Sequence, residues 1–159
     1  MRKYLTIFLF ISLISASLYS EDKDIPQINL STEDLEGRAK AGLALGYPFG
    51  LTFGYKLANY MEVNVFAGSH LNDFSLGTNL LFTVVDINIK EEMFPFSIGP
   101  AVYFNIDDDF NMAIAATVRG EYNFNEIPLN LYVEITPGFS FINDFDFYIA
   151  SSLGIRYVF

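Results

Sequence analysis

From residue 38 almost to the last residue, hydrophobic and polar residues alternate with a period of two. Successive side chains of a β-strand point to opposite faces, so this period is typical of strands with one apolar and one polar face. Turn-forming residues such as Pro48, Asn143 and Asp144 divide the region into segments. The pattern predicts eight strands, at about residues 39–47, 50–57, 61–68, 74–85, 94–105, 110–122, 129–141 and 145–159.

Three places interrupt the alternation. Pro100 falls inside the fifth predicted strand and Pro137 inside the seventh. Proline has no backbone N–H to give to a sheet ladder, so we expect a β-bulge at each of these positions. The acidic segment Asp86–Met93 is expected to be a loop between the fourth and fifth strands.

The first 37 residues follow a different pattern. Arg2 and Lys3 precede an apolar run over residues 4–14, and small residues follow at 15–17. This order is typical of a secretory signal peptide, and the run is shorter than the ~20 residues that span a bilayer as a helix. We expect a signal peptide over residues 1–20, a flexible acidic leader over 21–37, and one domain over 38–159. Cleavage after Ala16, Ser17 or Ser20 fits the pattern, and Ser20 is favoured because acidic residues follow it directly.

Composition narrows the class of protein. The chain carries a formal net charge of −10, yet 52% of its residues are hydrophobic, which is too apolar for a disordered acidic chain. Nine Lys and Arg against nineteen Asp and Glu leave no basic surface for nucleic acid. There is no Cys, which excludes disulfides, thiolate metal sites and cysteine nucleophiles.

The polar face of the predicted strands has the properties of a barrel interior. Of the eleven glycines, eight lie on this face, and the narrow interior of an eight-stranded barrel favours small residues. Four positive and four negative charges also lie there and cancel: Lys40, Lys56, Arg119, Arg156, Glu62, Glu121, Glu134 and Asp146. Eight charges facing lipid would cost on the order of 20 kcal/mol, more than the ~5–15 kcal/mol that stabilises a domain. In a membrane, the apolar face must therefore point outward. The remaining acidic residues divide between the leader and the turns, and Asp86 is counted with the turns.

Aromatic residues gather at both ends of the predicted strands, as in the interfacial girdles of membrane barrels. The segments Ala41–Pro48, Val133–Pro137 and Gly154–Phe159 resemble those of small OmpA-type barrels, in particular an uncharacterised spirochaetal family of outer-membrane barrels. The resemblance covers residues 38–159.

This resemblance implies a fold, a location and partners. The fold is an all-β, eight-stranded antiparallel up-and-down transmembrane β-barrel in the outer membrane of a diderm bacterium. Outer-membrane lipid surrounds such a barrel, and the barrel-assembly machinery acts on it during biogenesis. Tyr157 and Phe159 resemble the C-terminal assembly signal of bacterial outer-membrane barrels. An unidentified surface partner stays open, although the predicted outer loops are short, which weakens an adhesin interpretation.

Catalytic and metal-binding alternatives depend on few residues. Ser69, His70 and Asp73 form a possible nucleophile, base and orienting acid in an outer loop. An outer-membrane acyltransferase is the alternative that depends on these three residues, but all of them are ordinary turn residues. Asp107–Asp109 offers oxygen ligands for Ca²⁺, but its spacing matches no EF-hand loop. We therefore expect no enzyme activity, no cofactor and no metal.

Two other functions remain as alternatives. A pore requires an open lumen, whereas eight strands enclose a space that side chains fill, here including Phe66, Tyr103, Tyr132 and Tyr148. A soluble exported barrel that binds a hydrophobic ligand in the manner of a lipocalin requires the apolar face inside and the glycine-rich, charged face in water.

Overall fold

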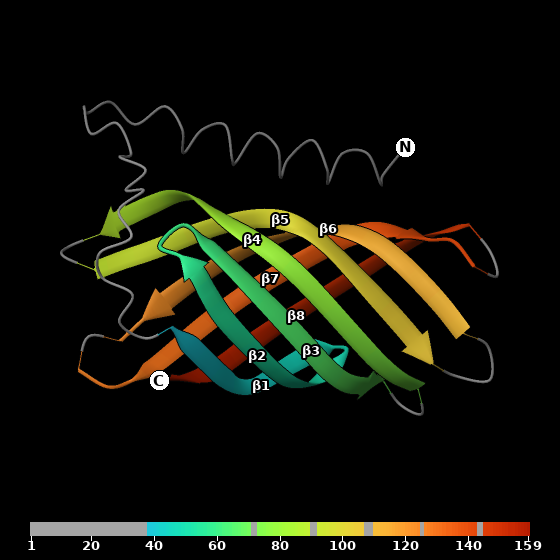
Figure 1. The fold of residues 1–159 in the computed structure, drawn as a ribbon, viewed down its shortest axis with the longest axis horizontal. Helices are drawn as coiled ribbons and strands as arrows, with labels where there is room; N and C mark the ends of the chain where they lie inside the picture. Colours follow the sequence, from blue (N-terminus) through green and yellow to red (C-terminus); the bar gives the residue numbers. More distant parts are fainter. Residues whose placement is uncertain (1–37, 71–72, 90–91, 107–109, 125, 143–144) are drawn as a thin grey trace, which may run out of the picture.

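The computed structural model describes residues 38–70, 73–89, 92–106, 110–124, 126–142 and 145–159. The predicted signal peptide and leader, residues 1–37, lie outside these ranges. Within them the chain forms one closed sheet of antiparallel strands, each paired with the next in sequence, and the last strand pairs with the first (Figure 1). The strands are β1 (Ala39–Tyr47), β2 (Phe49–Ala58), β3 (Met61–His70), β4 (Asp73–Ile89), β5 (Glu92–Ile106), β6 (Phe110–Asn123), β7 (Leu129–Ser140) and β8 (Asp146–Val158). The all-β, eight-stranded antiparallel barrel expected from the sequence is confirmed.

The barrel is polar inside and apolar outside. Outward-facing Leu51 and Val133 are 64% and 56% exposed, whereas inward-facing Arg156 is 0% exposed. Small, polar and charged residues make up most of the buried set, whereas large hydrophobic residues are exposed on all eight strands. This is the reverse of a water-soluble barrel, whose apolar residues fill the interior.

The two ends of the barrel differ in what they carry. β1 begins and β8 ends at one end, which we call the terminal end, together with the β2–β3, β4–β5 and β6–β7 connections (Figure 1). The β1–β2, β3–β4, β5–β6 and β7–β8 connections lie at the opposite end. These four are all short, as expected from the sequence.

The expected loop at Asp86–Met93 is wrong. β4 continues to Ile89, β5 begins at Glu92, and the two strands stay paired from Asp86↔Pro95 to Ile89↔Glu92. A register shift between Thr83 and Val85 explains the error. One extra residue in a strand reverses which side chains face inward, so a continuing strand looks like a break in the alternation.

The expected bulges at Pro100 and Pro137 are also wrong. Both prolines face outward and keep their register with one neighbouring strand, as Pro100↔Ala116 and Pro137↔Ile149. On the other side, the paired residues skip past each proline without a change of register. The missing N–H therefore interrupts one ladder locally, and the shifts of register in the described strands lie instead at Lys56/Ala58 and Thr83/Val85.

Candidate functional site

The middle of the barrel interior holds a network of charged side chains from five strands. Lys40 comes from β1, Glu62 from β3, Arg119 and Glu121 from β6, Glu134 from β7 and Arg156 from β8. Each lies on the inward face of its strand, because inward and outward positions alternate along a strand. All six are buried; Arg119 and Arg156 are 1% and 0% exposed.

Two glutamates bridge Lys40 and Arg156. The Lys40 Nζ lies 2.7 Å from Glu62 Oε2 and 2.6 Å from Glu121 Oε2. Arg156 reaches the same two carboxylates, with Nη1 3.0 Å from Glu62 Oε1 and Nη2 3.0 Å from Glu121 Oε1. Each carboxylate therefore faces two cations, which offsets the cost of removing these charges from water.

Arg119 joins a third glutamate to this group. Its Nε and Nη2 both donate to Glu134 Oε2, at 3.0 and 2.7 Å. Its Nη1 lies 3.3 Å from Glu62 Oε1 and 3.5 Å from Glu121 Oε1. Ser152 Oγ donates to the other Glu134 oxygen at 3.0 Å. The connected network thus contains three cations and three anions, and its formal charge is zero.

Uncharged groups complete the network. Asn64 Oδ1 accepts from Arg119 Nη1 at 2.9 Å and from Arg156 Nη1 at 2.7 Å. Asn130 donates to Glu121 Oε2 at 2.9 Å and accepts from Arg156 Nε at 2.8 Å. A buried polar network is stable only when its donors and acceptors are satisfied, and these amides fill positions that the carboxylates leave open.

An aromatic ring contacts both arginines. The guanidinium carbons of Arg119 and Arg156 lie 4.5 and 4.7 Å from the centroid of the Tyr132 ring. Tyr132 on β7 pairs with Gly154 on β8, and a Cβ built at Gly154 would overlap Cε1 and Cζ of the ring. The glycine therefore provides the space in which Tyr132 crosses the lumen.

Two further glycines make room for inward aromatic rings. Gly77 pairs with Tyr103 across β4 and β5, and a Cβ at Gly77 would lie 2.6 Å from two atoms of that ring. A Cβ at Gly68 would overlap Cζ of Phe66 on the same strand. These inward glycines thus leave the space that specific aromatic rings occupy in a narrow lumen.

The lumen is closed toward the opposite end. Ala101, Tyr103, Ala113 and Ala115 form a buried apolar cluster, with Phe66 and Tyr148 packed against it. Between this cluster and the charge network lies a void of about 10 Å³. That volume is about the minimum that holds one water molecule.

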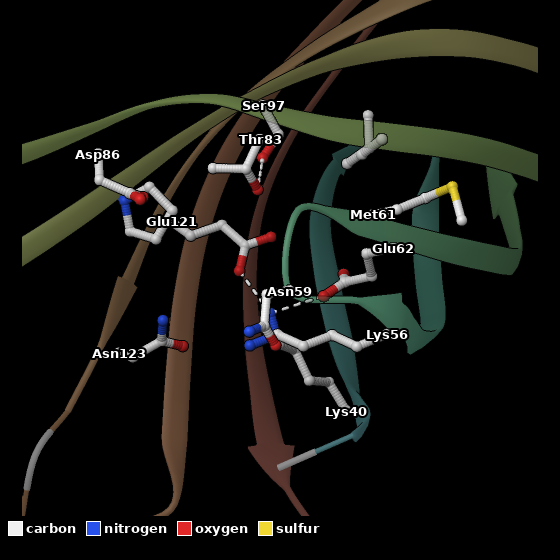
Figure 2. Close-up of a pocket in the computed structure, with 12 residues that line it drawn as sticks. Lys40, Lys56, Asn59, Met61, Glu62, Thr83, Asp86, Ser97, Glu121 and Asn123 are labelled. Atoms are coloured by element: carbon white, nitrogen blue, oxygen red, sulfur yellow. Dashed lines mark hydrogen bonds and ion pairs between the residues drawn. The ribbon is translucent and has the colours of Figure 1, made fainter. Parts of the chain in front are cut away.

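The terminal end, by contrast, contains a cavity of about 260 Å³. Nine of its twelve lining residues are polar or charged, and they include members of the charge network. Figure 2 shows Lys40, Lys56, Glu62, Asp86 and Glu121 around it. The remaining lining residues are Asn59, Met61, Leu81, Thr83, Pro95, Ser97 and Asn123.

The position of two residues expected in the lumen network differs from the prediction. Asp146 is exposed at the start of β8, where its Oδ1 accepts from the Phe147 N–H at 2.7 Å. It has the inward phase of β8 but lies beyond the enclosed part of the barrel. Lys56 points into the cavity, and no described carboxylate oxygen lies within 4.0 Å of its ammonium.

Sequence reasoning missed Asp86, which it assigned to a turn. The register shift between Thr83 and Val85 turns Asp86 inward, so that it lines the same cavity as Lys56. The loss of strict alternation after Thr83, combined with continued β-type residues, is the signal that could have located the bulge.

Most side chains on which the catalytic and metal-binding alternatives depend lie outside the described part of the chain. Ser69 is exposed near the end of β3, and His70 pairs with Asp73, but the side chains of the latter two lie outside the described part. Asp107–Asp109 also lies outside the described residues. Among the described residues, no group of three or more His, Asp or Glu side chains is arranged to hold a metal ion.

Tyr157 and Phe159 lie beside the seam that closes the barrel. Their rings are 4.9 Å apart, and both face outward, 49% and 68% exposed. The Phe159 N–H donates to the Ala39 carbonyl at 2.8 Å, which extends the pairing of β8 with β1.

No family model, curated protein or solved structure matches this chain. In the part of the chain that the structure describes, no helix is long and apolar enough to cross a membrane.

Proposed function

We propose that this chain is an integral outer-membrane β-barrel protein of a diderm bacterium, similar to small OmpA-type barrels, with a closed and charge-balanced lumen. Its role is structural or interactive at the cell surface and is not catalytic. The observation that carries the proposal is the inside-out distribution of side chains around the barrel.

The outer surface suits hydrocarbon better than water. Large apolar side chains cover it on all eight strands. Of the charged residues whose exposure the structure describes, only Arg38, Glu126 and Asp146 are exposed, and all three lie at strand ends or in a connection. A soluble monomer rarely exposes a continuous apolar surface of this kind. The strands, of 9 to 17 residues, also reach the ~9–11 residues that a tilted strand needs to cross a bilayer.

Aromatic contacts mark both edges of this apolar belt. Near the terminal end, Phe94 stacks on Tyr122 with ring centroids 5.2 Å apart. Near the opposite end, Phe139 stacks on Phe145 at the same distance. Aromatic residues favour the two membrane–water interfaces, so their positions support a belt that spans both leaflets.

The filled lumen supports a protein that does not conduct. The rings of Tyr103, Tyr132 and Tyr148, the charge network and the apolar cluster fill the described part of the lumen beyond the cavity, and the void between the network and the cluster is about the size of one water molecule. In planar bilayers we expect no steady current from the folded protein. A steady current of nanosiemens size would refute the closed lumen but would leave the membrane location intact.

The lipocalin-like alternative requires an apolar cavity. The described interior is charged, and the cavity at its terminal end is lined by charged residues, namely Lys40, Lys56, Glu62, Asp86 and Glu121. No observation favours this alternative over the membrane barrel.

Two partners follow from the proposal. Outer-membrane lipid covers the apolar belt, and the barrel-assembly machinery recognises the exposed rings of Tyr157 and Phe159 at the seam. Replacing Phe159 by Ala should slow assembly in cells, while export across the inner membrane continues.

The experiment that tests the proposal is folding into lipid vesicles, followed by gel electrophoresis in SDS with and without boiling. A folded barrel resists SDS and should migrate differently before boiling. If the purified protein instead folds and stays soluble without detergent or lipid, the membrane location is wrong.

A further inference from the structure

One cation in the barrel interior stands apart from the balanced network. Lys40, Arg119 and Arg156 each lie within 3.0 Å of a glutamate oxygen, whereas Lys56 has no described carboxylate oxygen within 4.0 Å. The network without Lys56 is already neutral. Asp86 lies on the same cavity wall beyond ion-pair distance, so Lys56 is the cation of the described interior that has no paired carboxylate.

The surroundings of Lys56 limit where a partner can come from. Lys56 is the next inward residue on β2 after Gly54, which pairs with Lys40, so the two lysines are diagonal neighbours on the cavity wall. Figure 2 shows both side chains running toward the middle of the cavity. Asp86 lies on the same wall but beyond ion-pair distance. A partner must therefore enter from the terminal end, because the charge network closes the other side.

The chemistry of the wall selects the partner. A singly charged anion gains a charge-assisted hydrogen bond from Lys56, and Asn59, Thr83, Ser97 and Asn123 offer neutral hydrogen-bonding groups. Glu62, Glu121 and Asp86 line the same cavity together with Lys40 and Lys56, and their negative charges oppose a dianion such as phosphate more strongly than a single carboxylate. A single carboxylate satisfies both conditions.

We propose that the cavity at the terminal end binds one carboxylate group on Lys56. Two sources have this chemistry. One is the chain itself, since residues 21–37 contain six Asp and Glu. This segment and Arg38 directly precede β1 in the sequence, and β1 carries Lys40. The other is a separate molecule with a carboxylate. This inference does not depend on the membrane location, because the cavity belongs to the folded barrel in any medium.

Photoaffinity labelling of the full chain tests the proposal. The probe is a short aliphatic carboxylate with a diazirine, and its primary amide is the uncharged control. Labelled positions are mapped by mass spectrometry. We expect the carboxylate to label the cavity wall, near Met61 and Asn123, roughly tenfold more than the amide, as one charge-assisted hydrogen bond would give.

Variants separate this result from non-specific labelling. Lys56→Gln should remove the preference for the carboxylate, whereas Lys56→Arg should keep it. Both variants should fold, since Lys56 makes no ion pair in the network, and gel mobility without boiling checks this. Labelling that persists unchanged in folded Lys56→Gln would overturn the proposal. Equal labelling by carboxylate and amide would also overturn it if it is found both in the original chain and in a variant without the acids of residues 21–37.

A second variant of the full chain distinguishes the two sources. It replaces the six acids of residues 21–37 by their amides. If the carboxylate probe labels this variant well and the original chain poorly, the chain supplies its own carboxylate. If both are labelled equally and the preference for carboxylate remains, a separate molecule is the partner.

Discussion

Replacing Gly154 by Ala should destabilise the barrel far more than the same replacement at Gly120. A Cβ at Gly154 would overlap two atoms of the Tyr132 ring, whereas a Cβ at Gly120 meets nothing within 4 Å. Both glycines lie within strands, so the change in backbone freedom is similar at the two positions. The comparison therefore isolates the effect of the ring.

The magnitude follows from what the ring contacts. Overpacking of a filled interior costs about 1–3 kcal/mol. Tyr132 can move away only by leaving Arg119 and Arg156, whose guanidinium carbons lie 4.5 and 4.7 Å from its centroid. Each cation–π contact in a desolvated site is worth about 2 kcal/mol. We therefore expect Gly154→Ala to lower the free energy of unfolding by about 3 kcal/mol or more. At Gly120, Ala should change it by less than about 1 kcal/mol.

Urea unfolding in lipid vesicles measures the difference. The chain has ten Tyr and no Trp, so tyrosine fluorescence and the folded fraction on unboiled gels are suitable signals. In a Tyr132→Ala background, Gly154→Ala should cost little, because the obstructing ring is absent. Equal unfolding free energies for Gly154→Ala and Gly120→Ala, or an unchanged cost of Gly154→Ala without the ring, would refute this packing argument.

Three further predictions concern the network, the outer face and the bulge. Glu121→Ala removes a carboxylate that pairs with Lys40 and Arg156, and it should lower the free energy of unfolding by about 3–5 kcal/mol. Asp146 is exposed, so Asp146→Ala should lower it by less than about 0.5 kcal/mol. Similar values for the two variants would contradict the position of Asp146 at the rim. Ile135→Arg places a charge on the apolar belt and should cost about 2–4 kcal/mol in vesicles; no cost there would argue against contact with lipid. Deleting Val84 removes the extra residue of the β4 bulge, so Val85 should directly follow Thr83 opposite Phe96 and Asp86 should keep its inward position opposite Pro95; the folded fraction in vesicles should stay close to that of the original chain, and loss of the folded form would contradict the position of the bulge.

Alternation alone was sufficient for most of the fold. Six buried members of the charge network were identified from their phase along the strands, and the preference of glycine for the same face indicated a narrow interior. These properties are local, since the period of a strand decides which face a side chain occupies. The strand ranges were also close to those observed, apart from the β4–β5 hairpin.

Properties that depend on closure of the barrel were not available from the sequence. Lys40 and Glu121 are 81 residues apart and meet only because β1 pairs with β8. The stacking of Tyr132 on two arginines depends on the register of β6, β7 and β8. The alternation along a strand tells which face a side chain occupies but not how far along the barrel axis it lies. For this reason the sequence predicts Asp146 in the lumen, although it lies at the rim. Asp86 was missed because a single bulged residue reversed its phase.

Site-directed spin labelling tests the inside-out arrangement most directly. The chain contains no Cys, so single labels can be placed at Leu51, Val133 and Leu153 on the apolar belt and at Glu126 in the β6–β7 connection. For protein folded in vesicles, the belt labels should collide often with oxygen and rarely with a water-soluble nickel complex, and the Glu126 label should show the opposite. If the belt labels are as accessible to the nickel complex as the label at Glu126, the apolar face is in water and the account of a membrane barrel is wrong.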